Sequence, residues 1–188
     1  MPTAAGFQKF LEGHAATLRK KAGASGFARL CPFLLAKEMK MDVRFIGEDS
    51  GLPADLLEVV LGSTGGSWDA GTLKLPDGRI HVYMNPGRDE KRQRSTLMEE
   101  VSHIHLGHKP TEIVSCGGIT FRTCNKSHEK QAFGLGAAAL LPLHLLKGAK
   151  TRGMTKEDLA EEHLVSIELV RFRCNVNRIV LRETPQAS

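Results

Sequence analysis

The chain has 188 residues, of which 41% are hydrophobic and 25% are charged, and its formal net charge is +5. This length allows one compact core with a small appendage, and the charge is compatible with nucleic acid or acidic partners without requiring either. The four cysteines exclude a secreted disulfide scaffold, because they are few and none has C-x-x-C spacing. We expect reduced thiols, with a Cys116–Cys124 bridge as the alternative.

The apolar segments are too short for a membrane protein. The most apolar of them, 134–146, is interrupted by Pro142 and falls short of the roughly 20 residues that a membrane helix needs. The start of the chain lacks the basic segment, long apolar stretch and cleavage site that direct secretion. We therefore expect a cytoplasmic protein with no membrane contact.

Helical and alternating hydrophobic patterns predict several elements in the first half of the chain. They are helices at 7–21, 27–39 and 53–61 and strands at 42–46, 67–75 and 79–84. Gly23 and Gly26 separate the first two helices, and residues 76–78 read P-D-G and supply the turn between the last two strands. This strand pair precedes the helix that carries the most informative residues.

The middle of the chain is predicted to be mostly helical. A helix begins near Glu90 and stops at Gly107, which is followed by a proline. Residues 113–122 predict a further strand or hairpin, and residues 127–146 predict another long helix. These elements complete an α+β pattern in which helices outnumber strands.

The C-terminal residues predict two helices joined by a tight turn, with Thr155 and Ser166 as their N-caps. The pattern resembles a helix-turn-helix, but Leu164 stands where glycine usually permits the sharp turn, which weakens a DNA-binding interpretation. Basic side chains here could contact phosphates, although basic C-terminal helices are more often solvent-exposed faces. These side chains are Arg171, Arg173, Arg178 and Arg182.

Acidic and histidine residues gather on the helix that begins near Glu90. Residues 96–108 read T-L-M-E-E-V-S-H-I-H-L-G-H, one substitution from the zinc-hydrolase signature H-E-x-x-H, with Glu99 in place of the first histidine. Glu99 and His103 lie one helical turn apart, and Glu100 lies within about 60° of His103. Metal hydrolysis needs such an arrangement, because side chains must hold a cation while a free carboxylate takes a proton from water.

A third metal ligand must come from another segment, and Glu129 is the natural candidate. It opens a helix of small residues that could approach the first helix closely. His128 is an alternative to Glu99, but neighbouring helix residues diverge by about 100°. His105 projects about 160° from Glu99 and is expected to pack, while His108 is expected to point elsewhere and to cap the helix.

The two helices together resemble the ImmA/IrrE-type metallo-endopeptidases, whose motifs are T-L-A-H-E-x-G-H and, farther along, E-x-x-A-x-x-F-A-x-x-L-L-M-P. Two motifs in order are stronger evidence than one short match, and the resemblance extends less specifically over roughly residues 28–175. The first motif is matched by Thr96, Leu97, Glu100, His103, Leu106, Gly107 and His108, and the second by Glu129, Ala132, Ala137, Leu140, Leu141 and Pro142.

The resemblance implies a fold and an activity. The fold would be helix-rich α+β, with a zincin-like metallopeptidase domain and its small β-sheet at 1–150 and a helix-turn-helix-like extension at 151–188 packed on it. The activity would be metal-dependent hydrolysis of a peptide bond in a repressor or related DNA-binding regulator, which switches on phage, mobile-element or stress genes. DNA itself is a weaker candidate partner.

By position, the resemblance implies His103 and Glu129 as metal ligands and Glu100 as the general base that later returns the proton. Glu99 falls on the remaining ligand position. A carboxylate there lowers the net charge of the site by one unit relative to imidazole, so water at the metal becomes less acidic. Zinc is the expected metal, and manganese or iron(II) are alternatives that suit an oxygen-rich site.

Other interpretations stay open at this point. Glu99 and Glu100 could be surface residues of an amphipathic helix, an interpretation that the second motif disfavours. A non-catalytic regulator could also keep the metallopeptidase scaffold to bind protein or DNA, with Glu99 marking the loss of the reactive site. Trp68 and Tyr83 could line a substrate cleft, although core packing is the safer expectation. An edge strand of the predicted hairpin could hold an extended substrate.

Overall fold

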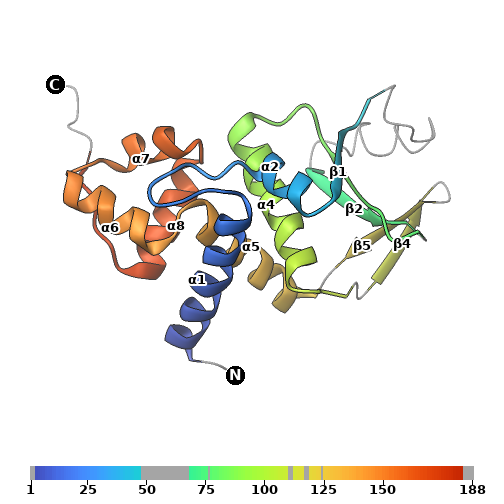
Figure 1. Ribbon diagram of the computed structural model, residues 1–188, viewed down its shortest axis with the longest axis horizontal. Helices are drawn as coiled ribbons and strands as arrows, with labels where there is room; N and C mark the ends of the chain where they lie inside the picture. The colour runs from blue at the N-terminus through green and yellow to red at the C-terminus, as the bar shows by residue number, and fades with distance from the viewer. Residues whose placement is uncertain are drawn as a thin grey trace.

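The computed structural model describes residues 3–47, 68–75, 77–109, 112–116, 119–123 and 125–183 (Figure 1). The helix predicted at 53–61 lies outside these residues. The helix-rich α+β class is confirmed. In chain order the elements are α1 (Ala4–Lys21), α2 (Pro32–Glu38), β1 (Met41–Phe45), β2 (Ala70–Lys74), β3 (Ile80–Met84), α4 (Glu90–His105), β4 (Glu112–Cys116), β5 (Ile119–Thr123), α5 (Lys126–Leu140), α6 (Leu143–Arg152), α7 (Lys156–His163) and α8 (Ile167–Asn177).

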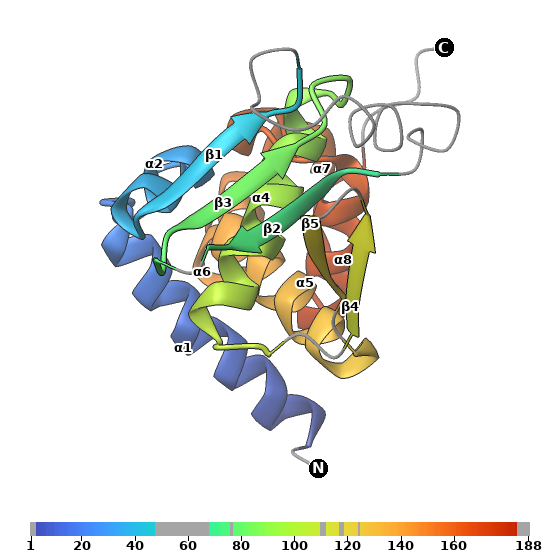
Figure 2. The same cartoon turned by 90° about the vertical axis from the view of Figure 1, so that its right-hand side faces the viewer.

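The described residues contain a three-stranded mixed sheet with the order β1-β3-β2. The central strand β3 is parallel to β1 and antiparallel to β2, with Val82 opposite both Val43 and Thr72. Figure 2 shows this sheet lying across α4, with β2 at the edge nearest to the separate β4–β5 hairpin. The strand pair and the later hairpin predicted from the sequence are therefore confirmed, and β2 is an edge strand.

The core forms where α4 and α5 pack against each other. α4 contributes Leu97, Met98 and Val101, each 0% exposed, and α5 contributes the buried alanines at 137–139. A Cβ atom built on Gly136 would lie 3.2 Å from the backbone carbonyl carbon of Met98, which shows how closely the two helices approach. The small residues of α5 therefore bring its backbone against α4, as its sequence predicts.

Two predicted helix boundaries are wrong, and proline explains both. The helix predicted at 127–146 is interrupted between α5 and α6, because the residue before a proline is disfavoured in the helical region. Leu141, which precedes Pro142, accordingly has φ −131° and ψ 75°. The helix predicted at 27–39 begins only at Pro32, since proline fits the first turn of a helix but not its interior.

The C-terminal helices α7 and α8 form the predicted pair. Thr155 caps α7 through a capping box with Asp158, and Ser166 caps α8. Leu164 makes the turn between them in the left-handed region, with φ 49° and ψ 57°. Arg94 of α4 supports this unfavourable conformation, because its guanidinium donates a hydrogen bond to the carbonyl oxygen of Leu164 at 3.0 Å.

Arg173 of α8 is buried, so the prediction that it could contact phosphate is wrong. Its side chain is 0% exposed, donates to the carbonyl oxygen of Leu141 at 2.8 Å and pairs with Glu12 of α1. The exposed side chains of α7 are acidic, which also disfavours contact with nucleic acid: Glu157, Asp158, Glu161 and Glu162. The division of the chain between residues 150 and 151 stays a prediction.

Two of the four cysteines can be compared with the prediction of reduced thiols. Cys31 is half-buried and Cys174 is buried, and both are free. Burial raises the pKa of the Cys174 thiol and so favours its protonated form. The prediction is confirmed for this pair, whereas the Cys116–Cys124 bridge involves side chains outside the description.

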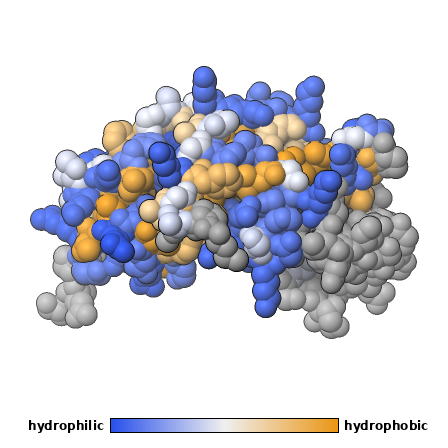
Figure 3. All heavy atoms as spheres, turned by 90° about the horizontal axis from the view of Figure 1, so that it is seen from below, coloured by the Kyte–Doolittle hydropathy of each residue, from blue (hydrophilic) through white to orange (hydrophobic). Residues whose placement is uncertain are grey.

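The surface mixes apolar and polar residues. The face seen in Figure 3 carries a band of apolar residues among hydrophilic ones. Large apolar side chains that reach solvent include Phe27 on the loop before α2, which is 56% exposed, and Val180 after α8, which is 74% exposed.

Within the described part of the chain, no single helix has the length and apolar character to cross a membrane, and α5 and α6 meet these criteria only together, across a 43° bend.

Candidate metal centre

The fold of α4 turns the predicted ligands toward a cleft. Asp89 caps the helix, because its side chain accepts a hydrogen bond from a backbone N–H group of the first turn at 3.0 Å. Leu97 and Val101 are fully buried in the core. Glu99 and His103 lie one turn apart on another side of the helix and are only partly buried.

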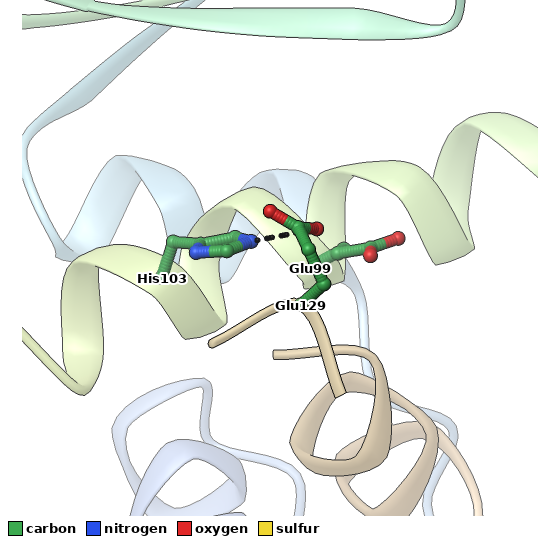
Figure 4. A group of neighbouring side chains, drawn as sticks. All are labelled: Glu99, His103 and Glu129. Atoms are coloured by element: carbon green, nitrogen blue, oxygen red, sulfur yellow. Dashed lines mark ion pairs between the residues drawn. The ribbon is translucent and has the colours of Figure 1, made fainter. Parts of the chain in front are cut away.

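The structure brings Glu99, His103 and Glu129 together. Each offers one ligand atom, and these atoms all lie within 4.8 Å of one another. Figure 4 shows two of the side chains on α4 and Glu129 on α5, with His103 Nε2 at 3.5 Å from Glu129 Oε2. Two segments that are distant in sequence therefore supply one compact group of oxygen and nitrogen donors.

The start of α5 determines where Glu129 lies. Asn125 caps the helix, and its side chain accepts hydrogen bonds from the backbone N–H groups of Ser127 and His128 at 3.1 and 2.9 Å. Glu129 therefore belongs to the first turn of α5, which packs closely against α4. The side chain of Glu129 is 46% exposed and that of His103 is 14% exposed, so solvent can reach the donor group from one side.

Glu100, the predicted general base, lies in the same cleft beside the sheet. The hydroxyl group of Thr72 on β2 donates a hydrogen bond to Glu100 Oε2 at 2.5 Å. Thr72 is 6% exposed, so this hydroxyl is shielded from competing water. The bond therefore holds the carboxylate of Glu100 near the edge strand and beside the three grouped residues.

A cleft of about 390 Å³ lies between the edge strand and α4. Residues 68–72 line one side of it, and residues of α4 together with Glu129 line the other. Trp68 contributes to this lining, so the expectation that it packs in the core is wrong. Tyr83 is 5% exposed and does lie in the core. The edge strand that borders the cleft is β2.

Burial and neighbouring negative charges disfavour ionisation of Glu99. Burial raises the pKa of Glu99 to about 7, and the carboxylates of Glu129 and Glu100 add to the rise. The positive charge of Arg92 opposes this shift, but Arg92 also pairs with Asp69 at the side of the cleft. Glu99 is therefore close to its titration midpoint at neutral pH.

The histidines of this region differ in their roles. Burial lowers the pKa of His103 to about 4, with further contributions from His108 and His128, so its imidazole is neutral at pH 7. His108 Nδ1 lies 3.1 Å from His103 Nδ1, and the prediction that His108 points elsewhere is wrong. His128 stacks on His108 with ring centroids 4.2 Å apart and does not join the donor group. His105 packs against His14, as expected.

Sequence reasoning missed the contributions of Thr72 and His108, and it named a place in the cleft for Trp68 only as an alternative to core packing. A signal for His108 is present in the sequence, because Gly107 can adopt the left-handed conformation that reverses the chain at a helix end. Its φ is 66°, and the reversal carries His108 back over the last turn of α4. Thr72 had no such signal, since its position depends on how β2 crosses α4.

Comparison with known proteins identifies the family. A model of the IrrE N-terminal-like domain, which is a peptidase family, matches residues 66–175. The chain belongs to this family. The match confirms the resemblance drawn from the two motifs and the zincin-like character of the fold. No curated protein matches the sequence.

A solved structure described as a Mycobacterium tuberculosis transcriptional regulator has a similar fold. The TM-score is 0.52 at 14% sequence identity, and the likeness covers 95% of this chain and 48% of that one. The present chain therefore spans about half the length of the regulator. At this identity the likeness supports the fold alone.

Membership in the IrrE N-terminal-like family implies a metal, and the donor group fits a divalent cation. Glu99 and Glu129 offer carboxylate oxygens and His103 offers a neutral imidazole, which are ligand types that zinc, manganese and iron(II) accept. The raised pKa of Glu99 supports the fit, because a cation would offset both the burial of its negative charge and the repulsion from Glu129 and Glu100.

Proposed function

We propose that this chain is a metal-dependent endopeptidase that cleaves a repressor or another transcriptional regulator. The observation that carries the proposal is the convergence of donor atoms from Glu99, His103 and Glu129 within 4.8 Å, in a cleft that also contains Glu100. Membership in a peptidase family supports hydrolysis, and a structural relative that is described as a transcriptional regulator supports a regulatory setting.

In this proposal Glu99, His103 and Glu129 would hold the cation, with zinc as the expected metal and manganese or iron(II) as alternatives. When bound, the cation supplies Lewis acidity, which polarises a peptide carbonyl and makes water more acidic. Glu99 moderates this effect, because its negative charge replaces the neutral imidazole of H-E-x-x-H. His103 contributes its neutral form at pH 7, since burial keeps the pKa of its imidazole near 4.

Glu100 would perform the proton transfers. Its carboxylate accepts a proton from water while the water oxygen forms a bond to the carbonyl carbon of the substrate. The same proton then passes to the amide nitrogen as the C–N bond breaks, so Glu100 ends as it began. Thr72 orients this carboxylate through the hydrogen bond that it donates to Glu100 Oε2.

The cleft suits an extended polypeptide. β2 is an edge strand of its sheet and borders the cleft, and a substrate strand can add to such an edge through main-chain hydrogen bonds. Trp68 and Arg92 offer an aromatic ring and a guanidinium to substrate side chains along the same cleft. Binding of this kind holds the backbone near Glu100 while it reads few side chains.

Cleavage of a candidate repressor by the metal-loaded chain tests the proposal. We expect the wild type to cleave it and Glu100→Gln to lose activity by about 10²- to 10⁴-fold while it still binds metal. Glu38→Gln, the same substitution at an exposed residue of α2, is the matched control and should retain full activity. Equal cleavage by wild type and Glu100→Gln would remove Glu100 from the mechanism.

A second candidate function is that of a non-catalytic regulator that keeps the scaffold to bind another protein. The observation that favours it is Glu99, whose carboxyl group is partly protonated at neutral pH because its pKa lies at about 7. Elemental analysis separates the two functions. A purified chain that holds no stoichiometric zinc, manganese or iron after supplementation would support the regulator and contradict the peptidase.

A further inference from the structure

The chain reverses direction directly after α4 and returns to the ligand group. Gly107 adopts a φ of 66°, and the backbone N–H of His108 donates a hydrogen bond to the carbonyl oxygen of His103 at 3.0 Å. The imidazole of His108 therefore lies against that of His103. Their Nδ1 atoms are 3.1 Å apart, and the two rings meet edge to face at 73°.

Two residues of α5 hold the ring of His108 in place. His108 Nε2 lies 3.1 Å from the side-chain oxygen Oε1 of Gln131. The ring of His128 stacks face to face on the ring of His108, with the centroids 4.2 Å apart and an angle of 7° between the planes. His108 is thus fixed both in the plane of its ring and across its face.

These contacts determine which nitrogen of each ring carries a proton. The amide oxygen of Gln131 accepts, so His108 Nε2 is the donor, and His108 Nδ1 is left with a lone pair. Two neutral imidazoles share one proton between facing nitrogens, so His103 Nδ1 must donate to His108 Nδ1. His103 Nε2 then keeps a lone pair, and this is the atom that faces Glu129 at 3.5 Å.

We propose that His108 is a positioning residue for the metal centre, which together with Gln131 holds His103 in the Nδ1–H tautomer and leaves Nε2 ready to bind a cation. A metal-binding imidazole usually donates its other N–H to a carboxylate, a backbone carbonyl or water. Here the imidazole of His108 accepts that hydrogen bond from His103. The amide oxygen of Gln131 accepts from His108 and so determines which of the two imidazoles is the donor. The inference rests on the proposed function only for the presence of a metal.

The tautomer can be measured on the metal-free chain of 188 residues. Histidine labelled with ¹⁵N gives distinct two-bond and three-bond couplings for the two neutral tautomers of each ring in NMR spectra. We expect the Nδ1–H pattern for His103 in the wild type and in Gln131→Glu, because a carboxylate is also an acceptor for His108. His108→Phe keeps a ring for stacking but removes the acceptor, and it should shift His103 toward the Nε2–H tautomer.

Metal affinity provides the second readout. Competition of zinc with a chelator should show about 10- to 100-fold weaker binding in His108→Phe, the usual cost of losing an outer partner of a metal ligand. Gln131→Leu should also weaken zinc binding, whereas Gln131→Glu should bind zinc at least as tightly as the wild type. His144→Phe removes an exposed histidine on α6, outside the cleft, and should leave both readouts unchanged.

The outcome separates this inference from the peptidase itself. If His103 has the same tautomer and zinc binds with the same affinity in Gln131→Leu and Gln131→Glu, then Gln131 and His108 do not determine the tautomer of His103 and the inference is wrong. That comparison remains available if His108→Phe fails to fold. If the variants shift both readouts as expected but no regulator is cleaved, the inference stands and the proposed function fails.

Discussion

His103 and Glu99, two members of the donor group, differ in whether a proton competes with a cation for the ligand atom at neutral pH. His103 is neutral at pH 7, because burial lowers the pKa of its imidazole to about 4. Glu99 has a pKa of about 7, raised by burial and by its carboxylate neighbours, so a cation must compete with a proton there. The imidazole side is therefore insensitive to pH near neutrality, whereas the carboxylate side depends on pH and on the charge of its partner.

Substitution of His103 or Glu129 should have the largest effect on zinc binding. His103→Gln and Glu129→Gln should each weaken zinc binding by more than about 100-fold, beyond the usual cost of an outer partner, because each replaces a metal ligand by a neutral amide that binds zinc weakly. The two variants should differ in Glu99, whose pKa should fall only in Glu129→Gln, where a repelling carboxylate is gone. Chelator competition and carboxyl NMR titration measure both effects. Wild-type affinity in either variant would remove that residue from the site.

Replacement of Glu99 by histidine should make the site less dependent on pH and more active. Glu99→His creates H-E-x-x-H and makes the second position neutral, so a bound cation keeps more of its charge. Peptide hydrolysis at pH 7 should rise on the order of tenfold, which corresponds to about one unit in the pKa of water. Steady-state kinetics of the zinc-loaded variant measure the change. A fall in activity with zinc still bound would mean that the carboxylate is required.

The metal-free protein should show the cost of ionising Glu99. The folded-state pKa of about 7 exceeds the ordinary value of 4.5, so the protonated group favours folding at low pH and this contribution is lost as pH rises through 7. Glu99→Gln cannot ionise, and its gain in Tm over wild type should be larger at pH 8 than at pH 5.5. Thermal unfolding with a chelator measures this gain, and an equal gain at both pH values would contradict the raised pKa.

The smallest expected effect concerns the approach of α5 to α4. Gly136→Ala places a Cβ about 0.5 Å inside ordinary contact with the Met98 backbone, which should cost on the order of 1 kcal/mol and weaken metal binding slightly, because α5 carries Glu129. Gly13→Ala in α1 meets nothing within 4 Å and should stabilise by about 0.5–1 kcal/mol. Denaturant unfolding measures the free energy of unfolding of both variants. Stabilisation by Gly136→Ala as well as Gly13→Ala would show that α4 and α5 are not in close contact at Gly136.

The fold and the ligand group were predictable to different depths. Helical spacing alone places Glu99 and His103 on one face of α4, but only the second motif pointed to Glu129, because their meeting depends on tertiary packing. Pro142 is visible in the sequence as an interruption of the apolar segment, and local backbone rules place a helix end there, but the predicted helix at 127–146 continues through it. His108 was missed because helical geometry was extended past Gly107, where the chain leaves the helix.

A metal-loaded crystal structure tests the central claim most directly, through the anomalous diffraction of zinc. We predict one strong anomalous peak between α4 and α5, with donor atoms of Glu99, His103 and Glu129 at about 2.0–2.2 Å from it. A zinc ion bound elsewhere, with the carboxylate of Glu129 directed into solvent, would contradict a shared site and the hydrolysis proposed from it.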